Sequence, residues 1–187
     1  MTKLSSEASD VLAHTVREAY MEVFPTDTVE SRLGVLEAGS YVAVTCSPTK
    51  GVDATLDLSE RLAKRGFKVV PHVAARMVRD KPHLREIIAR LNDLPIISIF
   101  VPGGDAETPA GDYVTALSLL RDIAELEHKF TEIGVAAHPE GHPAVGVEEL
   151  TNALLEKQAF ANYPVSYTHL TLPTIQHWCR SRWSAYH

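Results

Sequence analysis

The chain has 187 residues, enough for one ordinary domain with a sizeable core. Hydrophobic residues at 45% and charged residues at 22% are typical of a soluble globular protein, and the net charge of −6 argues against a nucleic-acid partner. No apolar run approaches the ~20 residues of a membrane span, no signal peptide begins the chain, and two cysteines cannot build a disulfide framework, so we expect a cytoplasmic protein.

Apolar runs alternate with amphipathic stretches along the chain, which predicts strands alternating with helices. Each of five predicted strands is followed by a helix, as in the parallel units of a (β/α)₈ barrel or a doubly wound sheet. Five units are too few for a closed barrel of about 250 residues, so we expect an α/β fold that is an incomplete (β/α)₈ TIM barrel. The predicted elements are a helix at 7–18, a strand at 19–25, a helix at 26–39, a strand at 41–46, a helix at 53–65, a strand at 67–73, a helix at 81–91, a strand at 95–101, a helix at 112–126, a strand from 133 and a helix at 147–160.

The end of the chain differs in composition from the rest. From Pro164 to His187 there is no Lys, Asp or Glu, yet both tryptophans fall there. Residues 164–174 also resemble a translated sequencing-library adapter. We therefore expect residues 1–163 to form the N-terminal part of a barrel domain and residues 164–187 to be a non-native, irregular tail, with a genuine C-terminal extension as the alternative.

Polar residues stand where several predicted strands end. The carboxyl ends of parallel strands meet at one edge, where α/β proteins bind their ligands. Each residue taken singly could be a strand-end cap or a surface loop residue, but polar groups at five strands together indicate an active site. They are Glu22, Thr45, His72, Asp105, His138, Glu140 and His142.

Two acidic residues are the strongest catalytic candidates. Glu22 stands inside an apolar strand, where a carboxylate is costly unless it is paired or kept protonated. A protonated carboxyl in an apolar pocket suits general acid catalysis, although Glu22 could instead form a structural hydrogen bond. Asp105 follows Gly103 and Gly104, whose backbone could approach a ligand closely, or simply form a tight turn.

His138, Glu140 and His142 are possible metal ligands. Pro139 prevents the helix on which a His-x-x-x-His pair binds zinc, and no glutamate directly follows the first histidine as in metalloproteases. We therefore predict no metal. The alternative is a metal-dependent barrel hydrolase that uses both histidines and Asp105.

Five motifs, in the same order, resemble those of the methylenetetrahydrofolate reductase family of flavin-dependent (β/α)₈ barrels. The similarity runs from about residue 20 to 162, roughly the first half of the family's barrel. The motifs are Met21-Glu22-Val23-Phe24-Pro25, similar to Phe-Glu-Phe-Phe-Pro; Val42-Ala43-Val44-Thr45, similar to Val-Ser-Val-Thr; Val70-Pro71-His72-Val73, similar to Pro-His-Leu; Gly104-Asp105, similar to the end of Leu-Arg-Gly-Asp; and Val135-Ala136-Ala137-His138-Pro139-Glu140-Gly141-His142-Pro143, similar to Val-Ala-x-Tyr-Pro-Glu-x-His-Pro.

The resemblance implies reduction of 5,10-methylenetetrahydrofolate to 5-methyltetrahydrofolate, a step of one-carbon metabolism that serves methionine biosynthesis. NAD(P)H would reduce FAD, and the flavin would pass the hydride to the folate. Glu22 would be the general acid at folate N10, and Asp105 would lie beside flavin and pterin; both would contact the substrate. The implied cofactor contacts are Thr45, His72, Gly104, Asp105, Ala116, His138, His142 and Lys157. The expected partner is a small-molecule folate, without nucleic acid or membrane, and the full-length parent could be a homo-oligomer.

Three residues depart from the family pattern. Gly103 and Glu156 stand where flavin-binding arginines are expected, and His138 replaces a tyrosine. Losing two cations near a pyrophosphate weakens the expectation of FAD more than that of folate. A flavin-independent relative, or a folate- or nucleotide-binding protein without turnover, stays open. Because an open sheet leaves an unpaired strand edge and half a pocket, the chain itself is expected to be inactive.

Overall fold

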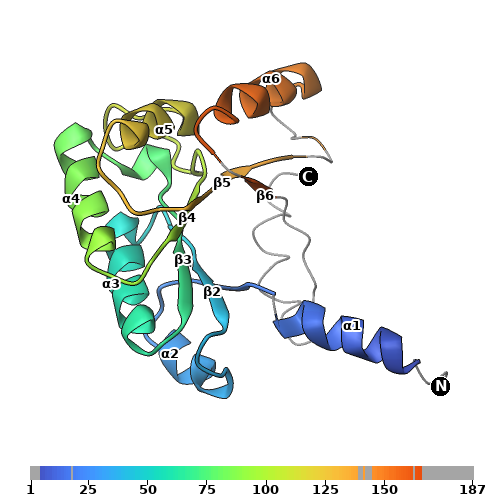
Figure 1. The fold of residues 1–187 in the computed structure, drawn as a ribbon. Helices are drawn as coiled ribbons and strands as arrows, with labels where there is room; N and C mark the ends of the chain where they lie inside the picture. Colours follow the sequence, from blue (N-terminus) through green and yellow to red (C-terminus); the bar gives the residue numbers. More distant parts are fainter. Residues whose placement is uncertain (1–4, 18, 139–140, 142–144, 162, 166–187) are drawn as a thin grey trace.

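The computed structural model describes residues 5–17, 19–138, 141, 145–161 and 163–165, in which strands and helices alternate (Figure 1). The strands are β1 (Met21–Val23), β2 (Tyr41–Val44), β3 (Lys68–Pro71), β4 (Ser98–Val101), β5 (Glu132–Ala136) and β6 (Tyr163–Val165). The helices are α1 (Ser6–Arg17), α2 (Val29–Arg32), α3 (Gly51–Lys64), α4 (Lys81–Asn92), α5 (Ala116–Ala124) and α6 (Val147–Lys157), with short 3-10 helices η1 (Leu33–Val35) and η2 (Ala75–Met77).

The strands form two parallel sheets in chain order, β1-β2-β3 and β4-β5-β6. A parallel bridge between His72 and Phe100 joins the two sheets just after β3. The predicted α/β class with parallel strands is therefore confirmed. The described strands do not close into a barrel, and β1 and β6 are their outer strands. No helix in the described part of the chain is long and apolar enough to cross a membrane.

Alternate residues of the strands lie on opposite faces, as the pleat requires. One face packs on the helices: Val44, Val69 and Ile99 are at most 3% exposed and share a core with Leu56 of α3 and Leu84 of α4. Figure 1 shows α3 and α4 on one side of the strands and α1 on the other. The opposite face, here called the inner face, is defined by Glu22, Ala43, Thr45, Val70, His72 and Phe100, which follow from the register of the paired strands.

The inner face carries its own small apolar cluster of Ala43, Val70 and Phe100. At the start of β2 and β3, the ammonium of Lys68 lies 4.3 Å from the ring centroid of Tyr41 and donates a hydrogen bond to its hydroxyl oxygen at 3.0 Å. A cation on an aromatic ring therefore lies at the amino end of this face.

Two predicted helices have different bounds in the structure. The helix expected at 26–39 is only α2 followed by η1, and Leu36 is already extended with ψ 143°. Gly34 weakens helix propensity there, and Gly39 takes φ 88° before β2. The helix expected from 112 begins at Ala116, because the Thr115 side chain accepts a hydrogen bond from the Ser118 backbone N–H and caps it.

Strand β6 was not among the predicted elements. Tyr163 pairs with Gly134 and Val165 with Ala136, both in parallel register. β6 thus includes Pro164 and Val165, which the composition of the chain had assigned to the tail. Residues 166–187 lie outside the described residues.

Candidate functional site

Glu22 and Thr45 meet on the inner face. The Thr45 hydroxyl donates a hydrogen bond to Glu22 Oε1 at 3.0 Å, from the residue that follows β2 to the middle of β1. The Thr45 backbone N–H also donates to the Val23 carbonyl at 2.9 Å, so the strand pairing extends to Thr45 and fixes its position relative to β1. Two residues 23 positions apart in the sequence, both predicted for the site, are therefore in direct contact.

The predicted burial of Glu22 is wrong. Met21 and Glu22 are exposed, and only Val23 of β1 is buried. The reason is that β1 is an outer strand of the described sheet, so no neighbouring strand covers the Glu22 side of the inner face. The carboxyl group is paired by Thr45, as the structural alternative foresaw, but apolar surroundings do not enclose it.

His72 lies next to Thr45 on the following strand, and its backbone N–H donates to the Val44 carbonyl at 2.9 Å. The side chain is 5% exposed, and its ring stands at 67° to the ring of Phe100, with 4.7 Å between centroids. Burial lowers the pKa of His72 to about 4, so the imidazole is neutral at pH 7. Thr45, His72 and Phe100 thus lie side by side at the ends of neighbouring strands, and Glu22, which pairs with Ala43, reaches them through its hydrogen bond with Thr45; these four residues are here called the row.

The loop after β4 packs against the loop after β3, where the Ala75 N–H donates to the Pro102 carbonyl at 3.0 Å. Gly104 has φ 96°, and a Cβ atom there would lie 3.1 Å from the Cβ of Ala74, so this position requires glycine both for its backbone and for its close contact. Asp105 is exposed, and none of the described residues forms a hydrogen bond or ion pair with its carboxylate. A Cβ atom at Gly103 would meet nothing within 4 Å, and the prediction that these two glycines let the backbone approach a ligand stays a prediction.

The other predicted contacts do not join the row. Ala116 is 5% exposed and belongs to the main core beneath the start of α5. His138 is exposed just after β5. Lys157, the last residue of α6, is half-buried, and this burial lowers the pKa of its ammonium group. Glu140 and His142 lie outside the described residues.

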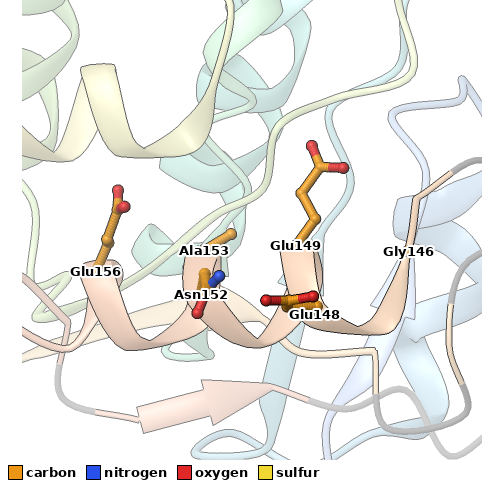
Figure 2. A pocket seen from close by; sticks show the side chains of 6 residues that line it. All are labelled: Gly146, Glu148, Glu149, Asn152, Ala153 and Glu156. Carbon is orange, nitrogen blue, oxygen red and sulfur yellow. The ribbon is translucent and has the colours of Figure 1, made fainter.

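The surroundings of α6 do not suit a pyrophosphate. An open depression of about 490 Å³ runs along one face of α6, and its lining includes Glu148, Glu149 and Glu156 (Figure 2). A flavin pyrophosphate carries negative charge and needs cations or free backbone donors. Gly103 and Glu156 stand where the resemblance implies arginines, and Lys157 is not among the residues that line this depression.

Sequence reasoning missed three residues that shape this region. Phe100 reads as ordinary core in an apolar strand, yet it is the aromatic neighbour of His72. Arg76 looks like a surface charge, but it holds the loop that carries Asp105. Cys46, half-buried after β2, has its pKa raised by burial and is therefore a weak nucleophile. No local pattern distinguishes these residues, because their contacts come from other strands and loops.

Within the described residues, no three His, Cys, Asp or Glu side chains are grouped so as to hold a metal ion. The alternative hydrolase site also needs His142, which lies outside the described residues. No known protein-family model matches the chain.

Proposed function

We propose that the described sheet is the first part of a (β/α)₈ barrel similar to methylenetetrahydrofolate reductase, and that its inner face binds a folate. The observation that carries the proposal is the hydrogen bond between Thr45 and Glu22, beside the buried pair of His72 and Phe100. Three of these four residues belong to the motifs that resemble the family. The proposed reaction is reduction of 5,10-methylenetetrahydrofolate to 5-methyltetrahydrofolate with NAD(P)H as the hydride donor.

Glu22 is the proposed proton donor. Thr45 holds Oε1 of its carboxyl group, which leaves the second oxygen for folate N10. Because Glu22 is exposed in the protein alone, the bound pterin has to supply the apolar surroundings; excluding water from a carboxyl favours its protonated form. Protonation of N10 then opens the five-membered ring, and the resulting iminium accepts the hydride.

The neighbouring groups suit a pterin ring. His72 is neutral and stands edge-to-face with Phe100 at 67°, so this buried pair gives a heterocycle bound beside Thr45 uncharged surroundings. The unpaired carboxylate of Asp105 can accept hydrogen bonds from the amide and amino N–H groups of the pterin. No step is assigned to FAD here, because the arginines that the resemblance implies at positions 103 and 156 are absent.

The proposal is tested by calorimetric titration of the chain with 5-methyltetrahydrofolate. Glu22→Gln should change the affinity by less than about threefold, because the amide still accepts from Thr45, while Glu22→Ala should weaken binding by about tenfold or more. Glu37→Gln, an exposed carboxylate before β2, is the matched control and should have no effect. Equal affinity of the unmodified chain and Glu22→Ala would contradict the proposed site.

A second candidate is a folate-binding protein without turnover. The exposure of Glu22 favours it, because the carboxyl group lacks the apolar pocket of an established general acid. Oxidation of NAD(P)H in the presence of 5,10-methylenetetrahydrofolate separates the two. In a parent protein with the complete barrel, the reductase predicts oxidation that Glu22→Gln reduces by about 10²-fold or more, whereas the binding protein predicts none with or without the substitution. The 187-residue chain itself is expected to be inactive.

A further inference from the structure

Arg76 connects the loop after β3 to the loop that carries Asp105. Its guanidinium donates from Nε to the carbonyl of Ala106 at 2.6 Å and from Nη2 to that of Glu107 at 2.6 Å. Nη1 donates to the carbonyl of Val114 at 3.4 Å. One side chain thus bonds to the loop directly after Asp105 and again just before α5.

Backbone hydrogen bonds complete this connection. The Arg76 N–H donates to the Gly103 carbonyl at 3.0 Å, and the Ala110 N–H donates to the Arg76 carbonyl at 2.8 Å. Asp105 is therefore bracketed by contacts to Arg76 at residues 103 and 106. Because no described residue pairs with the Asp105 carboxylate, its place depends on how the loop is held, and Arg76 holds the loop on both sides of it.

We infer that Arg76 is a positioning residue for Asp105 and acts on folate binding through it. This inference rests on the proposed function. A guanidinium suits the task because its planar fork can donate to three carbonyls at once, which the single ammonium of a lysine cannot do with the same geometry. Arg76→Lys should therefore restore only part of what Arg76→Ala loses.

The first readout needs no ligand. In hydrogen exchange of the full chain, Arg76→Ala should exchange the amide of Ala110, which donates to the Arg76 carbonyl, about tenfold faster or more. Arg79→Ala is the matched control, because the Arg79 side chain is exposed and only its backbone contacts the loop. Unchanged exchange in Arg76→Ala would overturn the inference whether or not folate binds.

The second readout is a double-mutant cycle with 5-methyltetrahydrofolate. Arg76→Ala and Asp105→Ala should each weaken binding by a similar factor, and the double variant should be no weaker than either within about twofold. If the double variant weakened binding by the product of the two single factors, the inference would be overturned, since Arg76 would then act independently of Asp105. Failure of the unmodified chain to bind the folate would contradict the proposed function instead, and the exchange result would still decide whether Arg76 holds the loop.

Discussion

At the residue scale, His72 couples the candidate site to pH. Its pKa is lowered to about 4 by burial, whereas an unfolded histidine titrates near 6.5, so the unfolded chain binds more protons between these values. The free energy of unfolding therefore rises with pH in this window. The contribution of His72 is fully present above about pH 6.5 and is lost as the pH falls toward 4. The expected total loss from this residue is on the order of 3 kcal/mol.

The measurement is urea unfolding at pH 7 and at pH 4.5 for the unmodified chain and for His72→Leu. Leucine cannot titrate, so the variant should lose less stability between the two pH values than the unmodified chain. Identical losses would mean that His72 is accessible to protons in the folded chain.

For Glu22, the sequence predicted the need for a partner correctly but the burial of the side chain wrongly. A lone carboxylate within an apolar strand correctly pointed to a partner, which is Thr45. The prediction that Glu22 is buried is wrong, because the burial of a strand residue depends on which strands flank it, and β1 is an outer strand. The pairing of His72 with Phe100 was equally hidden, since it joins two sheets across a single bridge.

At the scale of elements, the loop of residues 102–115 is held by backbone packing as well as by Arg76. A Cβ atom on Gly111 would lie 1.8 Å from the carbonyl oxygen of Arg79, and the adjacent Asp112 N–H donates to the same oxygen at 2.7 Å. Gly111→Ala should therefore displace the loop and cost about 1–3 kcal/mol of unfolding free energy.

Gly103→Ala is the control within the same loop, because a Cβ atom there meets nothing within 4 Å. Thermal or urea unfolding of both variants checks the prediction. A Gly111→Ala chain as stable as Gly103→Ala would show that the loop can leave Arg79 without loss.

Most elements could be predicted because their patterns are local. The uninterrupted apolar runs of β2, β4 and β5, and the periodicity of α3 and α4, depend only on burial against one layer of helices. The prediction of one continuous helix at 26–39 is wrong, because Gly34 and the turn at Gly39 outweigh the helical spacing of the apolar residues there. β6 is too short to give a clear pattern, and its pairing with β5 decides its structure.

At the scale of the whole molecule, the described sheet has an exposed outer strand. Tyr20, Met21 and Phe24 are 49%, 42% and 42% exposed along or beside β1. Exposed apolar edge strands promote association, and a lysine on the edge opposes it. Met21→Lys should therefore lower concentration-dependent association, measured by sedimentation velocity, without loss of secondary structure.

Val35→Lys is a suitable comparison, since Val35 is 87% exposed in η1 and lies outside every strand. It should leave association unchanged. If Met21→Lys and Val35→Lys lowered association equally, the cause would be the change in net charge rather than the edge of β1.

The most direct test of the folate site is to map binding of 5-methyltetrahydrofolate by NMR on the unmodified chain. A folate site on the inner face predicts saturable shifts of the backbone amides of Glu22, Thr45, His72 and Asp105, with a Kd within about 1 μM to 1 mM, the range common for enzyme substrates. Amides of Arg61 and Arg90, on the outer surfaces of α3 and α4, should not move. Absence of saturable shifts, or shifts confined to α3 and α4, would contradict a folate site on the inner face.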